Sequence, residues 1–402
     1  MKTISGLLFF YPDIIFYKVP NQTFIGGYFM IVKNLLVVGV VAGFASAAAA
    51  EDSKGNWSVG GRVRVDAEQM STEFKPNGGD KTTGKSSEVK LNRAQFTLTG
   101  NRGANDSLAI TYYANSSELY SAVISHKFSD MVTAHFGKMK VLALGVENSY
   151  EEIDTYITSI AGKAAPMNST GARLDFGFGD HTVSVQAVEG VRSWSTMVED
   201  GVGNSSTDAS TFEPRGGLTS ALQYRGNLNN GMIKPVVTYT QVRSSSTKGA
   251  GKVTNEIMGQ KDSVDYTSDY KNGLANMLGV GAQINTAGAV IDLEYDSITN
   301  PKQKDSDEKD VKVSSVVAQV KYAVGSSTPF LKVTSDSKKF GLDKDFGDQT
   351  AMNLALGVEH NLDASCRLHA FYMSKALTMK NMEGKDNKHT TTGFNFGVTA
   401  SM

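Results

Sequence analysis

Several features on which most folds rely are scarce in this sequence. Cys366 is its single cysteine, so no disulfide can form within the chain. Beyond residue 50, no apolar stretch approaches the roughly 20 residues that a membrane-spanning helix needs. A chain of this kind can reside in a membrane only as a β-barrel, because lipid cannot satisfy an open backbone. Its stability must then come from a closed ladder of hydrogen bonds.

Charge of one sign and catalytic side chains are also scarce. Without its first fifty residues the chain keeps 37 basic and 40 acidic residues, so there is no basic excess for binding nucleic acid. The histidines fall in separate segments, with no recognisable serine or aspartate signature and no metal-ligand spacing. We therefore expect no catalytic residue, cofactor or metal, and no enzyme activity. The histidines are His126, His135, His181, His360, His369 and His389.

The N-terminal region has the pattern of an export signal. Lys33 precedes a short apolar run and then a row of small residues that ends at Ala50. This order is typical of a secretory signal peptide over residues 30–50, which leaves residues 51–402 as the mature domain. Residues 1–29 do not fit that design. We interpret them as an over-long start upstream of Met30, the alternative being a genuine extended leader.

The main pattern in the remaining sequence is alternation between apolar and polar residues. The last ten residues show it best, because apolar side chains such as Phe394, Phe396 and Val398 alternate with Asn395, Gly397 and Thr399. About sixteen segments repeat this period of two, as a strand does when one face meets lipid and the other water. We predict an all-β, antiparallel transmembrane barrel of about sixteen strands.

The connections between these segments alternate between very short and long. The short ones carry turn residues, as at Ser129-Asp130 and Gly179-Asp180, whereas the long ones are rich in Ser, Thr, Gly, Asp and Lys. Short periplasmic turns and long extracellular loops are the outer-membrane arrangement. Residues 115–118 are the exception, a short link on the long side. A secreted β-sandwich would also explain the alternation, but not this order of connections.

The polar faces of the strands predict the lining of a channel. A charge facing a water-filled lumen costs little, whereas at mid-depth on the lipid face it costs about 2–4 kcal/mol. Asp66 and Glu68 share a strand with two of the arginines, so the mixture of signs predicts no ion preference. The arginines expected to line the lumen include Arg62, Arg64, Arg93 and Arg173.

Residues 141–170 form a long, partly apolar connection that is expected to fold inward and narrow the lumen. Its acidic side chains would then face the arginines across a constriction and filter solutes through a transverse field. The alternative is an ordinary solvated outer loop. Lys138 and Lys140 precede it and are candidates for contact with passing anions or for the rim. The acidic residues are Glu147, Glu151, Glu152 and Asp154.

Residues 89–160 resemble the phosphate-selective porin O/P family. The similar elements are a strand that carries Arg93 and ends at Gly100, the strand LYSAVISHKF, and the Gly-Lys-Met-Lys segment at 137–140. They cover about a fifth of the chain. The resemblance implies a sixteen-stranded, trimeric porin of Gram-negative bacteria. It also implies that the third outer loop, residues 141–170, folds into the barrel. We do not extend phosphate selectivity to this chain, because Arg62 and Arg64 share their strand with acidic residues.

These observations favour a porin in the cell outer membrane that lets small hydrophilic solutes and ions diffuse through a water-filled channel. Its expected partners are membrane lipid, lipopolysaccharide and further copies of the same chain. Two alternatives stay open, an anion- or phosphate-selective channel and a structural or adhesive barrel whose outer loops carry the function.

Overall fold

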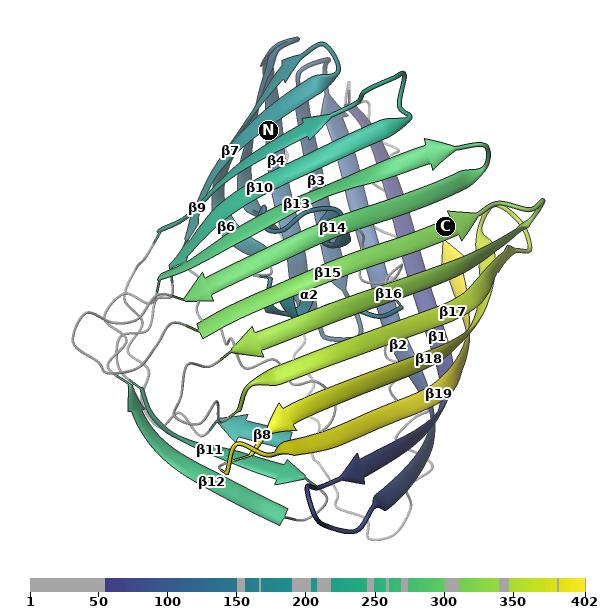
Figure 1. Cartoon of the computed structure of the whole chain (residues 1–402). Coiled ribbons are helices and arrows are strands. Elements are labelled where there is room, and N and C mark those ends of the chain that lie inside the picture. The colour runs from purple at the N-terminus through teal and green to yellow at the C-terminus, as the bar shows by residue number, and fades with distance from the viewer. Residues whose placement is uncertain are drawn as a thin grey trace, which may run out of the picture.

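A closed antiparallel barrel of sixteen strands makes up most of the structure, a computed structural model (Figure 1). It describes residues 55–149, 156–165, 168–189, 204–207, 218–243, 249–257, 260–268, 274–300, 311–339, 347–381 and 383–401. The first and last barrel strands pair with each other, with Arg62 opposite Ser401. No barrel strand is therefore left with an open edge, and the expected fold class is confirmed. The proposed leader, residues 1–50, lies outside the described residues.

The barrel strands follow one another around the wall in chain order. Their bounds are β1 Gly55–Lys75, β2 Thr82–Arg102, β3 Asp106–Tyr113, β4 Glu118–Ser129, β5 Val132–Lys140, β6 Asn168–Phe178, β7 His181–Glu189, β9 Leu218–Gly226, β10 Ile233–Arg243, β13 Leu274–Thr286, β14 Ala289–Asn300, β15 Val311–Tyr322, β16 Ser327–Lys339, β17 Gln349–Asn361, β18 Cys366–Lys380 and β19 Asp386–Ser401.

Few elements lie outside the barrel wall. The connection between β5 and β6 contains a 3₁₀ turn, η1 (Glu147–Ser149), and a short helix, α2 (Ile160–Ala164). Three further strands, β8 (Asn204–Thr207), β11 (Gly249–Ile257) and β12 (Gln260–Ser268), pair as a separate sheet near the long connections (Figure 1). Among the described residues, no helix has the length and apolar character needed to cross a membrane.

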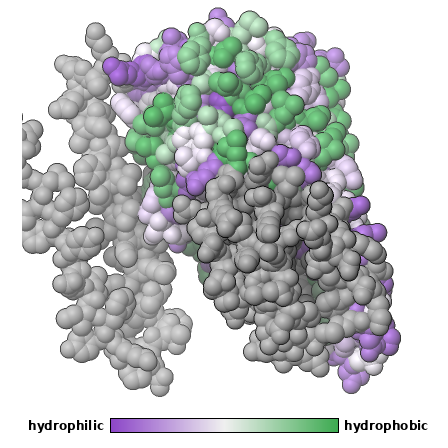
Figure 2. All heavy atoms as spheres, turned by 90° about the vertical axis from the view of Figure 1, so that its left-hand side faces the viewer, coloured by the Kyte–Doolittle hydropathy of each residue, from purple (hydrophilic) through white to green (hydrophobic). Residues whose placement is uncertain are grey.

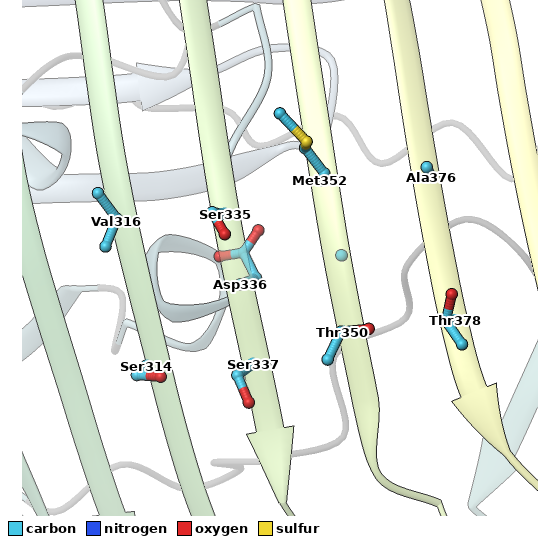
Figure 3. Close-up of a pocket in the computed structure, with 10 residues that line it drawn as sticks. Ser314, Val316, Ser335, Asp336, Ser337, Thr350, Met352, Ala376 and Thr378 are labelled. Atoms are coloured by element: carbon cyan, nitrogen blue, oxygen red, sulfur yellow. The ribbon is translucent and has the colours of Figure 1, made fainter. Parts of the chain in front are cut away.

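The outer wall is apolar, as the alternation predicts. Leu222, Leu293 and Phe396 are 52, 48 and 58 % exposed. In water, the hydrophobic effect would favour burying each of these side chains. Figure 2 shows a broad hydrophobic area on the described part of one side of the molecule. The neighbours of these residues along each strand, such as Gln223 and Asp292, are buried on the inner side. A wall with this inverted distribution is suited to lipid outside and a polar lumen inside.

Leu293 offers a direct test of this assignment. A Leu293→Lys variant should lose about 2–4 kcal/mol of stability in lipid, because the charge would sit on the lipid face in the middle of β14. The matched control is Thr97→Lys, on the inner face of β2, which should cost far less. Urea unfolding of both variants from lipid vesicles would measure the difference. Equal losses would contradict the assignment of faces.

Two hairpins extend farther than the sequence pattern indicates. The polar composition of residues 71–88 and 376–391 predicts two long loops. In the structure, Ser71–Phe74 of β1 pairs with residues 82–85 of β2. Strands β18 and β19 likewise pair as far as Lys380 and Asp386. The turns are confined to short segments, where Gly79 N–H donates to Pro76 O at 3.3 Å and Gly384 N–H donates to Asn381 O at 2.9 Å. These extensions contain several threonines, which are polar but favour strand structure.

Three register shifts interrupt the alternation where a strict period of two fails, in the β1–β2, β3–β4 and β4–β5 pairs. Asn92 has no partner in β1, since Arg64 pairs with Arg93 and Val65 with Leu91. Tyr120, expected on the apolar face, is likewise an extra residue in β4. Its ring stacks on that of Tyr113, with centroids 4.2 Å apart. An inserted residue changes the direction of the side chains that follow it, which corrects the placement of Tyr120.

Candidate channel constriction

The connection between β5 and β6, residues 141–167, is here called the inner loop. Its first described segment, Val141 to Val146, is buried. Leu142 N–H donates to Gln186 Oε1 at 2.8 Å, and Thr240 Oγ1 donates to Leu142 O at 2.5 Å. Since Gln186 and Thr240 are buried on the polar, inner side of β7 and β10, the loop lies inside the barrel. This confirms inward folding for its described residues.

Helix α2 fixes the second described segment of the inner loop. Ser159 caps it, its Oγ accepting from Gly162 N–H at 2.8 Å. The wall then supplies acceptors for the next two free N–H groups, since Ile160 donates to Asp336 Oδ1 at 2.9 Å and Ala161 to Ser315 Oγ at 3.1 Å. Helix N-termini always leave such groups unsatisfied. These contacts attach α2 to β15 and β16, and Figure 1 shows it behind the front wall of the barrel.

An apolar patch on the inner wall completes the anchor. Leu144 and Ile160 of the inner loop pack against Met277, Ile298 and Val313, all at most 2 % exposed. These three wall residues stand at positions where alternation calls for lumenal, polar side chains. That departure is the signal by which the docking place could have been found in the sequence.

Glu147 is part of the anchor rather than a charge facing the pore. Its carboxylate accepts from Ser159 N–H at 3.2 Å and from Ser159 Oγ, and Lys332 Nζ lies 2.7 Å from Oε1. Both partners of the ion pair are buried. The expectation that Glu147 faces arginines across the lumen is therefore wrong, because its charge is neutralised at the wall. Glu151, Glu152 and Asp154 lie outside the described residues.

Arg64 also lies beneath the inner loop. It is 3 % exposed, its Nε is 2.9 Å from Asp66 Oδ1, and its guanidinium carbon is 5.3 Å from the centre of the Tyr156 ring. Tyr156 stacks on Phe330 at 4.4 Å and donates its hydroxyl to Glu359 Oε1 at 2.7 Å. Burial, with the Glu359 carboxylate alongside, raises the pKa of Tyr156, so its hydroxyl stays a donor.

The remaining basic candidates are spread around the wall. Arg62 and Arg93 are half-buried on β1 and β2, with the Arg93 guanidinium 4.1 Å from the centre of the Tyr113 ring. Arg173 Nε lies 3.0 Å from Asp175 Oδ1. The arginines therefore do not converge at one place.

The two lysines that precede the inner loop separate. Lys138 pairs in register with Ala122 and donates to Leu119 O at 2.6 Å, beside the short outer link, which places it at the rim. Lys140 instead donates to the carbonyl of Asn148 in the inner loop. Lys140 is therefore the lysine that the fold brings to the inner loop.

Three strands bring together a Ser–His–Asp set that the sequence did not reveal. His135 Nδ1 is 2.7 Å from Ser125 Oγ, and its Nε2 is 3.0 Å from Asp175 Oδ2. Acyl transfer would also need donors aimed at a developing oxyanion. The backbone around Ser125 is engaged in ladders with β3 and β5, so we interpret the set as a polar network of the wall. Among the described residues, no three His, Cys, Asp or Glu side chains could hold a metal ion.

Solved structures provide the comparison, since no protein-family model and no curated protein matches the chain. The outer membrane channel DcaP of Acinetobacter baumannii is 12 % identical, with a TM-score of 0.58 over 88 % of this chain and 99 % of that one. Outer-membrane expressed OmpT of Vibrio cholerae is 13 % identical, with a TM-score of 0.55 over 88 and 99 %. A trimer form of in-vitro folded OmpT gives 0.53 at 13 % identity, over 87 and 99 %.

Identities this low establish the fold alone, and membership in the phosphate-selective porin O/P family stays a hypothesis. The similar solved structures are outer-membrane barrels, and the exposed apolar wall of this barrel is suited to lipid. The chain is an outer-membrane β-barrel of sixteen antiparallel strands.

Proposed function

We propose that this protein is a porin that forms a water-filled channel for the passive diffusion of small hydrophilic solutes and ions. The observation that carries the proposal is the inner loop, which docks on one side of a polar lumen and narrows it. A barrel of sixteen strands is wide enough to leave an aqueous channel. A loop held by buried contacts would set the diameter of that channel without closing it.

The proposal extends to the surroundings of the channel. We propose a homotrimer in outer-membrane lipid and lipopolysaccharide, exported through a signal peptide at residues 30–50. A trimer form among the similar structures supports this assembly. Arg62, Arg93, Arg173 and Lys140 remain the proposed basic lining, and Glu151, Glu152 and Asp154 remain proposed constriction residues. We propose no enzymatic role and no cofactor.

Planar bilayers would test the channel. The purified, refolded protein should give steady ohmic current steps across a potassium chloride gradient. The reversal potential should lie near zero, because many lumenal charges pair with opposite ones, as Lys321 does with Glu359 at 2.9 Å. Heat-denatured protein is the control.

The other outcomes have distinct meanings. A strong anion shift of the reversal potential would favour the anion-selective alternative. A folded, inserted barrel that carried no current would contradict the proposal and move the function to the outer loops.

A further inference from the structure

A cavity of about 350 Å³ lies beneath the first segment of the inner loop. Its floor is the inner wall of β6, β9, β10 and β13, including the last residue of β9, Gly226, and the second of β10, Lys234. Both lie beside the short connection between these strands, which marks the periplasmic end. The cavity therefore extends from the inner loop towards the periplasmic end of these strands.

The charged residues in the described lining of this cavity all carry the same sign. Lys140, Arg173, Arg225 and Lys234 line it, and its described lining contains no carboxylate. Arg225 and Lys234 are exposed to the lumen. Arg173 and Arg225 line the same cavity, and like charges that share a small space repel each other. An anion in the cavity would relieve the part of this repulsion that Asp175 leaves.

Among the described residues, the acidic groups near the cavity balance only part of this charge. Asp175 pairs with Arg173 and with His135, each at 3.0 Å, and so balances only part of the charge. Asp292 accepts from Gln283 Nε2 at 3.0 Å and from Gln319 Nε2 at 3.1 Å. Neither carboxylate belongs to the lining of the cavity.

The shape and donors of the cavity define the ligand that it suits. Arg225 Nε donates to Gln223 Oε1 at 2.5 Å, which holds the guanidinium fork in place. A fixed fork beside a lysine ammonium matches the oxygens of a carboxylate or phosphate. Val141, Val146 and Pro235 add apolar surface to the same lining. A compact organic body could pack there while its anionic group meets the cations.

We propose that this cavity is a binding subsite for small organic anions that carry a carboxylate or phosphate group. The inference rests on the proposed channel function and names a solute class for it. Anions crossing the constriction would pause at the subsite, so their flux would saturate while that of neutral solutes would not.

Block of the potassium chloride current would measure occupancy. The probes are benzoate and inorganic phosphate, added to the full-length folded protein in a planar bilayer. The wild-type current should fall as the concentration of at least one probe rises, and the block should reach a plateau. Arg225→Gln and Lys234→Gln should each raise the half-blocking concentration about tenfold, the equivalent of about 1.4 kcal/mol for one charged contact.

A matched variant separates the subsite from general charge. Lys375→Gln removes a half-buried lysine on β18, outside the cavity, and should leave the half-blocking concentration within about twofold of wild type. An equal shift in all three variants would overturn the proposal, as would block that never saturates.

Calorimetric titration of the detergent-folded protein with both probes tests binding without any current. Saturable binding of either probe that Arg225→Gln weakens supports the subsite, even if the barrel does not conduct. Conduction without binding of either probe would refute the subsite and leave the channel intact. Absence of current would refute the proposed channel alone.

Discussion

A Glu147→Gln variant should release the inner loop and turn steady channel openings into larger, noisy ones. The substitution keeps an acceptor for Ser159 but leaves the Lys332 ammonium buried without a counter-charge. Breaking a buried ion pair from one side typically costs about 3–5 kcal/mol. Detachment of the loop lets water reach Lys332, so the cost should appear as loss of the docked state. Single-channel recordings would show it as higher conductance with rapid flicker.

The double variant Glu147→Gln with Lys332→Met is the control. It removes both charges and keeps the hydrogen bonds of Ser159, so steady openings should largely return, since removing both charges of a buried pair is often nearly neutral. The cycle comprises the wild type, Glu147→Gln, Lys332→Met and the double variant, each unfolded by heat. A coupling energy near zero between the two positions would contradict the anchoring role of the pair.

Gly279→Ala should displace the inner loop by steric contact alone. A Cβ atom at this position of β13 would lie 2.2 Å from the carbonyl carbon of Leu144 and 2.4 Å from Gly145 N. Both are backbone atoms, and Gly145 is held by its 2.5 Å hydrogen bond to Glu294 Oε1. Because no flexible side chain can yield, we expect a loss of about 1–3 kcal/mol, as for an overpacked core. Altered single-channel conductance should accompany the loss.

Gly177→Ala provides the matched control. Gly177 is also a wall glycine, on β6, but a Cβ atom there would meet nothing closer than 3.9 Å. It should retain wild-type conductance. If Gly279→Ala conducted in the same way as Gly177→Ala, the close approach of loop and wall would not control the channel.

The barrel was predictable because its physical rule is local. Each residue either faces lipid or does not, so a period of two identifies strands such as β14 without knowledge of their neighbours. The rule fails at Asn92, Tyr120 and Phe128, each an inserted residue that changes the direction of the side chains that follow it. It also gives no information on β8, β11 and β12, which pair with one another in a separate sheet.

The site was less predictable because its contacts join distant segments. The role of Glu147 depends on Lys332, which arrives on β16 and cannot be paired with it from spacing. The basic cavity is formed by residues of β6, β9, β10, β13 and the inner loop, which only the folded barrel brings together. Inward folding of the loop could be predicted from its apolar content. Its docking place could have been inferred from Met277, Ile298 and Val313, apolar residues on a face that is otherwise polar.

The anchors of the inner loop also impose an order on assembly. Glu147 is bound by Lys332, and Ile160 by Asp336, so the loop depends on strands made more than 150 residues later. Until those strands join the wall, the loop can contact β7, β10 and β14 but lacks the contacts to β16 that fix Glu147 and helix α2. The wall must also close around the loop, because β1 and β19 meet only at the very end. We therefore expect a folding intermediate that lacks β15 and β16 to lack the docked helix α2, so that the inner loop reaches its final position late in folding.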